Sequence, residues 1–259
     1  MTKILQVLLI TLLSLSFGRC LGETDSSANF GIDQALEKYA KAESTTDRSE
    51  REKLFNEALK TFLVEATAQP SGKLFYNIGN TYAYLGEYGF AIAFYRKAEG
   101  LMPRDPALHQ NLQKVIDLAG VSGYQIESPV ADMIGLRSFS PLEQHLLLLG
   151  LAVFSLVLFS LNVWLPSIGF KWVSRVSIAC TLLLIISLAS YHFFMPPRAV
   201  IVKAAGLRIT QMSVNEARFI LHPGEMVEVL DMGNKGGLVR VRTATSVTGY
   251  LPQEVICIV

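Results

Sequence analysis

The sequence predicts a multidomain membrane protein with an all-α helical repeat, a two-helix transmembrane hairpin and a C-terminal all-β barrel. Three patterns carry this prediction: a helical period of apolar residues in the first half, two uncharged apolar runs in the middle, and alternating strands at the end. Hydrophobic residues make up 51% of the 259 residues and charged residues only 17%, which is too apolar for a wholly soluble chain. The predicted segments are a signal peptide (1–22), the repeat domain (31–120), a linker (121–141), a transmembrane helix (142–165), a cytoplasmic turn (166–175), a second transmembrane helix (176–195) and the barrel (199–259).

The N-terminus has the layout of a secretory signal. Lys3 precedes an uncharged apolar run over 4–17, and small residues follow from Gly18. Arg19 stands directly before Cys20, where lipid attachment needs a small residue, so we do not expect a lipoprotein. The alternative to a cleaved signal is a retained N-terminal anchor. Both place the segment that follows outside the cytoplasm.

The two apolar runs are long enough to cross a bilayer. Residues 146–165 are uncharged, and twenty residues at ~1.5 Å rise span the ~30 Å hydrocarbon layer. The run over 176–195 returns the chain after a short connection that carries Lys171 and Arg175 and no acid. Because positive loops stay in the cytoplasm, we expect the repeat and the barrel on the same extracytoplasmic side.

The first exported part contains an internal repeat. Pro70 and Pro103 each follow a helical run, and the best unit covers 72–105. This unit resembles the tetratricopeptide repeat at the signature positions occupied by Phe75, Ile78, Gly79, Tyr82, Ala91, Tyr95, Ala98 and Pro103. The resemblance implies antiparallel helix pairs that stack on their neighbours and bind peptides or protein segments.

In tetratricopeptide arrays the ligand groove is lined by the first helix of each pair. The resemblance therefore implies groove positions at Tyr76, Asn77 and Asn80, and at Gln110 and Lys114 in the helix that follows. Asparagine side chains can both donate to and accept from a peptide backbone. The alternative is that the two asparagines only follow the repeat consensus. A complete clamp for a C-terminal carboxylate is not expected.

The C-terminal region changes from a helical period to a period of two. Residues 226–230 and 238–242 alternate apolar and polar side chains around a turn-rich link, which predicts a hairpin. With the closing segment GYLPQEV, the region 199–259 resembles a bacterial SH3-type domain. Tyr250 is the aromatic residue of its expected binding surface, whereas Leu238 stands where that family often has Trp. Polyproline recognition is therefore not expected, and a cell-wall peptide or a protein surface remains open.

The sequence carries no recognised motif for catalysis, metal binding or a cofactor. Cys20, Cys180 and Cys257 are scattered without metal-ligand spacing, and the glycine-rich phosphate-binding motifs are absent. A net charge of +1 without a long basic run gives little attraction for nucleic acid. We therefore expect no enzyme activity, no cofactor, no metal and no nucleic-acid partner.

The order of signal, tetratricopeptide repeat, two-helix hairpin and SH3-like barrel is similar to the aerotolerance-operon proteins of the BatE type. This resemblance implies a bacterial inner-membrane protein that works with von Willebrand A-type membrane proteins and a MoxR-type ATPase in envelope stress tolerance. From the residues alone we expect a non-enzymatic scaffold that presents protein-interaction modules to the periplasm. The alternative is an envelope sensor whose barrel binds peptidoglycan peptides.

Overall fold

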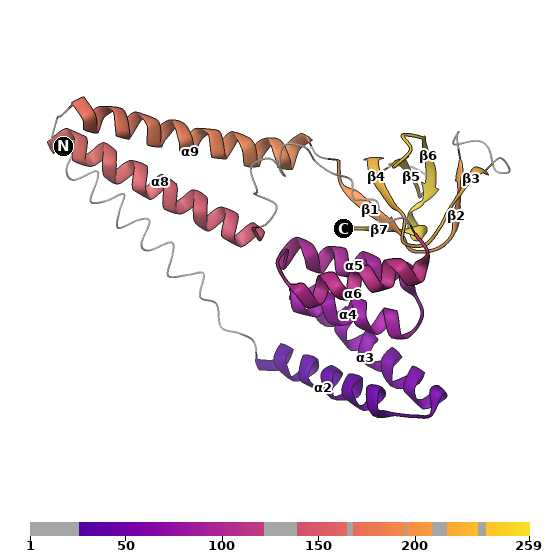
Figure 1. The fold of residues 1–259 in the computed structure, drawn as a ribbon. Coiled ribbons are helices and arrows are strands. Elements are labelled where there is room, and N and C mark those ends of the chain that lie inside the picture. Colours follow the sequence, from indigo (N-terminus) through magenta and orange to yellow (C-terminus); the bar gives the residue numbers. More distant parts are fainter. Residues whose placement is uncertain (1–25, 122–138, 165–167, 195, 209–216, 233–236) are drawn as a thin grey trace.

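The computed structural model describes residues 26–121, 139–164, 168–194, 196–208, 217–232 and 237–259 (Figure 1). The predicted signal peptide and most of the predicted linker lie outside these residues. The described α-helices are α2 (Ser26–Ser44), α3 (Arg48–Ala68), α4 (Gly72–Tyr84), α5 (Tyr88–Leu101), α6 (Pro106–Ala119), α8 (Pro141–Trp164) and α9 (Ile168–Phe194). The strands are β1 (Arg198–Ile201), β2 (Ala205–Arg208), β3 (Ala217–Leu221), β4 (Met226–Asp231), β5 (Leu238–Thr243), β6 (Thr248–Pro252) and β7 (Ile256–Ile258).

Side-chain caps define where the helices of the first part begin. Asp47 accepts a hydrogen bond from the Ser49 N–H at the start of α3, and Ser71 accepts one from the Leu74 N–H at the start of α4. Asp105 caps α6 in the same way and is followed by a proline at the first helical position. Each cap satisfies an N–H group that the helix itself leaves unpaired. These short-range signals place the helix boundaries.

Helices α4 and α5 form a tight pair. A Cβ atom built on Gly79 would lie 2.6 Å from Cδ1 of Tyr95, so only glycine allows the α5 side chain to approach this closely. The turn between the helices contains Gly86 with φ of 79°, a conformation that favours glycine. The core shared with α2 and α3 consists of Ala35, Ala58, Leu59, Phe62, Leu74, Ile78 and Phe94.

Helices α8 and α9 lie side by side and have buried hydroxyl groups between them (Figure 1). The Ser155 hydroxyl lies 2.6 Å from that of Ser177 and 2.9 Å from that of Thr181. Within the described residues, one helical stretch, Pro141–Leu161 of α8, is long and apolar enough to cross a membrane. The last turns of α9 have no described side chains, so the second span at 176–195 remains a sequence prediction.

The connection between these helices is shorter than predicted. Helix α9 begins at Ile168, so most of the predicted turn over 166–175 is helical. Arg175 lies 5.9 Å from the centroid of the Trp172 ring one turn earlier on the helix. Long basic side chains can remain on a helix end because the charged group reaches water while the stem covers apolar surface.

The strands form one curved antiparallel sheet in the order β3-β2-β6-β5-β4-β1-β7. The predicted hairpin is confirmed, because β4 pairs with β5 in antiparallel register. Alternate residues of the strands face inward and form the sheet core, as the period of two predicts. This core consists of Ala199, Ile201, Leu207, Leu221, Val227, Val229, Val239, Val241, Leu251 and Val255.

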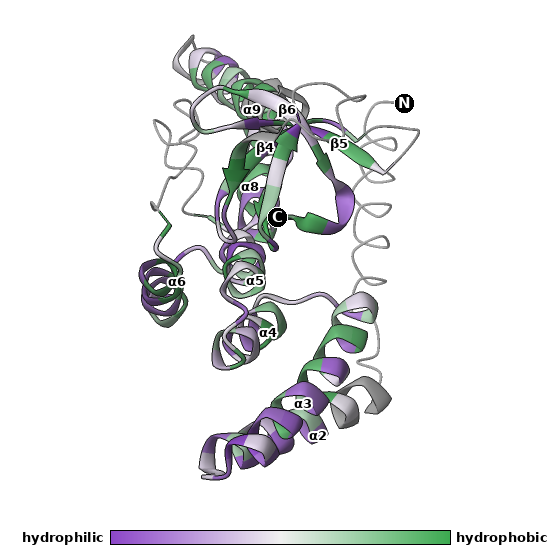
Figure 2. Ribbon diagram, turned by 90° about the vertical axis from the view of Figure 1, so that its right-hand side faces the viewer, coloured by the Kyte–Doolittle hydropathy of each residue, from purple (hydrophilic) through white to green (hydrophobic). Residues whose placement is uncertain are grey.

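Helix α5 packs directly against the sheet, which the sequence did not reveal (Figures 1 and 2). A Cβ atom on Gly89 would lie 2.8 Å from the Val202 carbonyl oxygen and 3.0 Å from that of Ile201. Ile92 approaches Gly224, whose φ of 98° is again a glycine conformation. The helical part and the sheet therefore share an apolar core.

Two glycines of α5 test this packing. We expect Gly89→Ala to lower the free energy of unfolding by about 1–3 kcal/mol, because the added methyl group must displace the backbone of the β1 end. Gly100→Ala is the matched control, since a Cβ atom there meets no atom within 4 Å. Thermal unfolding of the full chain in detergent measures both variants. Equal unfolding temperatures would contradict the close contact between α5 and the sheet.

Candidate functional site: a tyrosine stripe on the helical part

Three side chains on α4 form a stripe along one side of the helix. Tyr76, Asn80 and Tyr84 follow one another at intervals of four residues, a spacing that places them on the same helical face. We call them the α4 stripe. Helix α2 reaches the stripe through Tyr39, and α6 reaches it through Asn111. The stripe therefore lies between contacts from α2 and from α6.

A hydrogen-bond network holds the centre of the stripe in place. The Asn111 amide donates to the Tyr76 hydroxyl at 2.8 Å and to Oδ1 of Asn80 at 3.0 Å. The Tyr95 hydroxyl donates to the same Asn80 oxygen at 2.6 Å from beneath the stripe. Burial raises the pKa of the Tyr95 phenol well above its ordinary value, so this hydroxyl stays protonated and remains a donor.

The end of the stripe nearest α2 is aromatic. The Tyr84 ring stacks on Phe55 with centroids 4.8 Å apart, and Tyr39 meets both rings edge-on. The Tyr84 hydroxyl donates to Glu43 at 2.9 Å, and this hydrogen bond raises the pKa of Tyr84. Tyr84 is nevertheless 58% exposed. It therefore presents a fixed aromatic surface to solvent.

The other predicted groove residues take different positions. Asn77 is half-buried on α4, and its backbone carbonyl oxygen accepts a hydrogen bond from the Thr81 hydroxyl at 2.7 Å. Gln110 and Lys114 are exposed on α6 and line a shallow hollow, whereas the network described above reaches α6 through Asn111. Sequence reasoning missed Asn111. The repeat length could have identified Asn111, because this residue lies 34 residues, one repeat, after Asn77.

Tyr250 lies on the sheet, away from the α4 stripe. It is half-buried on β6, opposite Arg240 on β5 and Arg208 on β2. The sequence predicted Tyr250 alone as a binding residue of this surface. The arginines beside it become visible only through the strand register.

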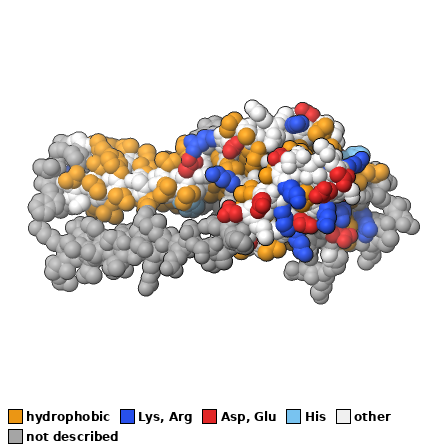
Figure 3. Space-filling view, turned by 90° about the horizontal axis from the view of Figure 1, so that it is seen from below, with side chains coloured by type: hydrophobic (Ala, Val, Ile, Leu, Met, Phe, Trp, Pro, Cys, Tyr) orange, Lys and Arg blue, Asp and Glu red, His pale blue; other side chains and the backbone are white. Residues whose placement is uncertain are grey.

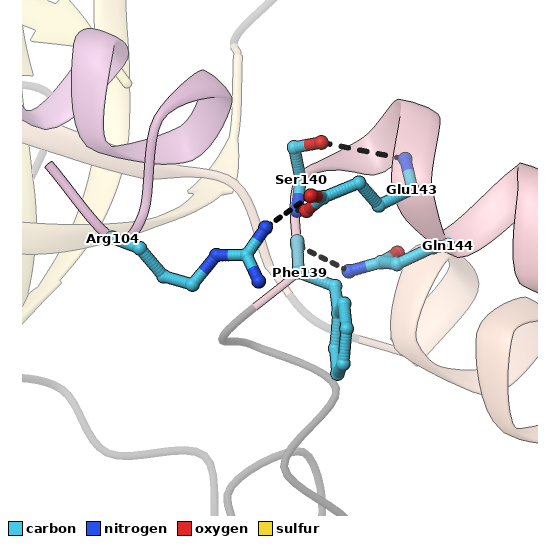
Figure 4. A network of polar contacts seen from close by, with 5 residues as sticks. All are labelled: Arg104, Phe139, Ser140, Glu143 and Gln144. Atoms are coloured by element: carbon cyan, nitrogen blue, oxygen red, sulfur yellow. Dashed lines mark hydrogen bonds and ion pairs between the residues drawn. The ribbon is translucent and has the colours of Figure 1, made fainter.

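A polar junction connects the helical part to α8 (Figure 4). Arg104, from the loop before α6, forms an ion pair with Glu143 and lies 5.5 Å from the centroid of the Phe139 ring. Glu143 also accepts a hydrogen bond from the Ser140 N–H at 2.8 Å, while the Ser140 hydroxyl accepts one from the Glu143 N–H. The Gln144 amide donates to the Phe139 carbonyl oxygen at 3.1 Å. This reciprocal cap fixes the first turn of α8 at the point that Arg104 contacts.

The chemistry of the α4 stripe is that of a recognition surface. Phenol rings provide apolar contact area, and amide groups donate to or accept from a peptide backbone. Among the residues that the structure describes, no group of three or more His, Cys, Asp or Glu side chains could hold a metal ion. These side chains provide aromatic and amide groups that can contact a peptide.

Substitutions of two asparagines on α4 test the hydrogen-bond network of the α4 stripe. We expect Asn80→Ala to cost about 1–3 kcal/mol, because it leaves the buried Tyr95 hydroxyl without its partner. Adding Tyr95→Phe removes that hydroxyl, so the double variant should be less destabilised than the sum of the single ones. Asn77→Ala serves as the control outside the network. Additive unfolding free energies in chemical denaturation would contradict this assignment.

Comparison with known proteins assigns no family. No protein-family model matches the chain, and no curated protein does.

Proposed function

We propose that this protein is a membrane-anchored, non-enzymatic scaffold whose helical part and sheet bind other proteins. In this proposal α2–α6 are tetratricopeptide units, the sheet is an SH3-like domain, and α8 and α9 form a transmembrane hairpin. The observation that carries the proposal is the α4 stripe. Its central groups are held by Tyr95 and Asn111, while the Tyr84 ring remains open to solvent.

The polarity of α8 and α9 supports the membrane anchor. Side chains that face the partner helix include buried hydroxyl residues, Ser155, Ser177 and Thr181, whereas leucine, valine and phenylalanine side chains face outward. Figure 3 shows this apolar outer surface next to the charged surface of the rest of the chain. A helix pair in water would bury the apolar residues instead, while hydroxyl contacts between helices are common in a bilayer. The proposed environment of this pair is therefore lipid.

The anchor and the recognition surfaces are joined by direct contacts. Arg104 and Glu143 connect the helical part to α8, and α5 connects the helical part to the sheet. A ligand on the α4 stripe and a ligand on the sheet would therefore be held close together, which raises their effective concentration for one another. Holding two ligands close together is the function of a scaffold. The resemblance to BatE-type proteins suggests von Willebrand A-type membrane proteins and a MoxR-type ATPase system as its partners in the periplasmic envelope complex.

The proposed topology predicts where reporters are active. Periplasm-active reporters should work when fused after Gly120 or Val259, and cytoplasm-active reporters when fused after Phe170, because the end of the hairpin that carries Lys171 and Arg175 stays inside. A membrane-impermeant thiol reagent gives an independent readout on single-cysteine variants at the same places. Opposite sides for the two ends would refute the shared-side scaffold.

The recognition role predicts a difference between two exposed residues. Tyr84, 58% exposed, belongs to the α4 stripe, and Val64, 61% exposed, lies on α3 outside it. We expect Tyr84→Arg to reduce partner binding by about 30-fold, as loss of about 2 kcal/mol at an aromatic contact would. Val64→Arg should leave binding unchanged.

Quantitative co-purification of membrane proteins with the tagged full chain in mild detergent provides the measurement. Circular dichroism of both variants controls for folding. Equal recovery with Tyr84→Arg and Val64→Arg would exclude the α4 stripe as the binding surface.

A further inference from the structure

We propose that the pair α8 and α9 binds the headgroup of an anionic phospholipid near the start of α9, where Lys171 and Arg175 lie beside Trp172. The ligand class is a phospholipid of net negative charge, with phosphatidylglycerol as the probe. This inference rests on the membrane anchor of the proposed function. It involves neither the α4 stripe nor the sheet, so it does not depend on the proposed protein partners.

Three exposed side chains near the start of α9 form the proposed site. Lys171 and Arg175 are about one helical turn apart, so they lie on the same side of the helix. The Arg175 guanidinium lies 5.9 Å from the centroid of the Trp172 ring, within the range of a cation–π contact. Trp172 is 63% exposed, so a lipid beside the helix can reach its ring. We call these three side chains the basic cluster.

The helix pair supplies no acidic side chain to neutralise the basic cluster. The sequence has no Asp or Glu over 144–197, and Glu143 lies near the opposite end of α8, where it pairs with Arg104. Among the residues that the structure describes, no ion pair involves Lys171 or Arg175. A negatively charged ligand therefore complements the charge of this end of the helix pair.

The register of the two helices places Arg175 beside α8 and not beyond its end. The Ser155 hydroxyl contacts those of Ser177 and Thr181, and Phe159 lies ~6 Å further along α8 than Ser155. In the same direction, Arg175 lies ~3 Å along α9 from Ser177 and ~9 Å from Thr181, which puts it level with Phe159. Helix α8 continues for more than another turn past this level. The positive charge is therefore beside an apolar stretch of α8.

A charge at this level of a membrane helix needs an anionic partner. Burying a charged side chain in a bilayer is costly unless its long stem carries the charge to the headgroups or an opposite charge pairs with it. Tryptophan is enriched at the same depth of the bilayer. Phe159 and Leu161 of α8 are exposed near this level and offer apolar contacts to acyl chains.

Net charge determines which phospholipid fits the basic cluster best. A zwitterionic headgroup contains a phosphate, but its ammonium group cancels the negative charge. An anionic headgroup retains that charge, and basic residues beside a membrane attract anionic lipids for this reason. The basic cluster should therefore enrich an anionic phospholipid over a zwitterionic one.

Tryptophan fluorescence of the full chain tests the lipid preference at the basic cluster. The sequence contains two tryptophans, so Trp164→Phe leaves Trp172 as the single emitter. This variant is placed in phosphatidylcholine vesicles with a minor fraction of either brominated phosphatidylglycerol or brominated phosphatidylcholine, because bromine quenches tryptophan at short range. We expect the brominated phosphatidylglycerol to quench more strongly, with a preference of about tenfold that falls as salt is added.

Substitutions in the basic cluster test the role of its charges. A basic side chain beside an anionic membrane contributes up to about fivefold in affinity, and salt reduces this contribution. Lys171→Gln and Arg175→Gln should therefore each lower the preference about threefold, and the double variant should abolish it. Arg175→Lys keeps the charge and should retain most of the preference. Lys203→Gln, which removes an exposed lysine between β1 and β2, is the control and should leave the preference unchanged.

Inorganic phosphate distinguishes a lipid site from a site for any phosphate. Added at the same total concentration as the anionic lipid, it should not reduce the preference, because it has no acyl chains to contact α8. Loss of the preference in phosphate would overturn the proposal. Equal quenching by the two brominated lipids, or an unchanged preference in the double variant, would overturn it as well.

Failure of this inference differs from failure of the membrane anchor. If α9 lies outside the bilayer, neither brominated lipid quenches Trp172, and the anchor is refuted together with the lipid site. If both lipids quench equally, the anchor stands and only the lipid preference is refuted. The vesicles have the same lipids in both leaflets, so the result does not depend on the orientation that the reporter fusions measure.

Discussion

The middle of helix α5 is buried on all sides, and the arrangement of the helical part and the sheet depends on this burial. Five consecutive residues, Ala91 to Tyr95, are buried, which a helix at a surface cannot achieve. One side of α5 packs on α4 and α6, and another side packs on the end of β1. Glycines at the close approaches make this possible, because Gly79, Gly89 and Gly224 leave no room for a side chain. The two parts therefore form one body with a common core.

The pair α8 and α9 has the opposite distribution of polar and apolar side chains. Their hydroxyl side chains are buried against each other, while large apolar side chains cover the outside. In water this arrangement would expose far more apolar surface than soluble proteins tolerate, whereas in lipid it satisfies both the hydroxyl groups and the leucines. The Arg104–Glu143 ion pair then connects the start of α8 to the helical part. The junction gives the helical part a defined position relative to α8.

The two surfaces that we propose for binding, on the helical part and on the sheet, differ in chemistry. The α4 stripe is aromatic and rich in amides, so it suits contacts with a peptide backbone and apolar side chains. The outer face of the sheet carries the side chains of Arg208 and Arg240 on either side of Tyr250. A partner complex could engage both surfaces without competition for the same groups. Such a division is compatible with a scaffold that brings different segments together.

Local patterns in the sequence determined the helices of the first part, the apolar length of α8 and the β4–β5 hairpin, because caps, turns and periodicity depend on residues close in the chain. The resemblance to the tetratricopeptide repeat indicated Tyr76 and Asn80 as groove positions, which stays a prediction. Tertiary structure alone decided the contact between Ile92 and Gly224, the hydrogen-bond partners of Asn111 and the placement of two arginines beside Tyr250. The physical reason is that a periodic pattern shows which side of an element is apolar but not which distant element covers it. That choice depends on shape complementarity and strand register, which arise only when the whole chain packs.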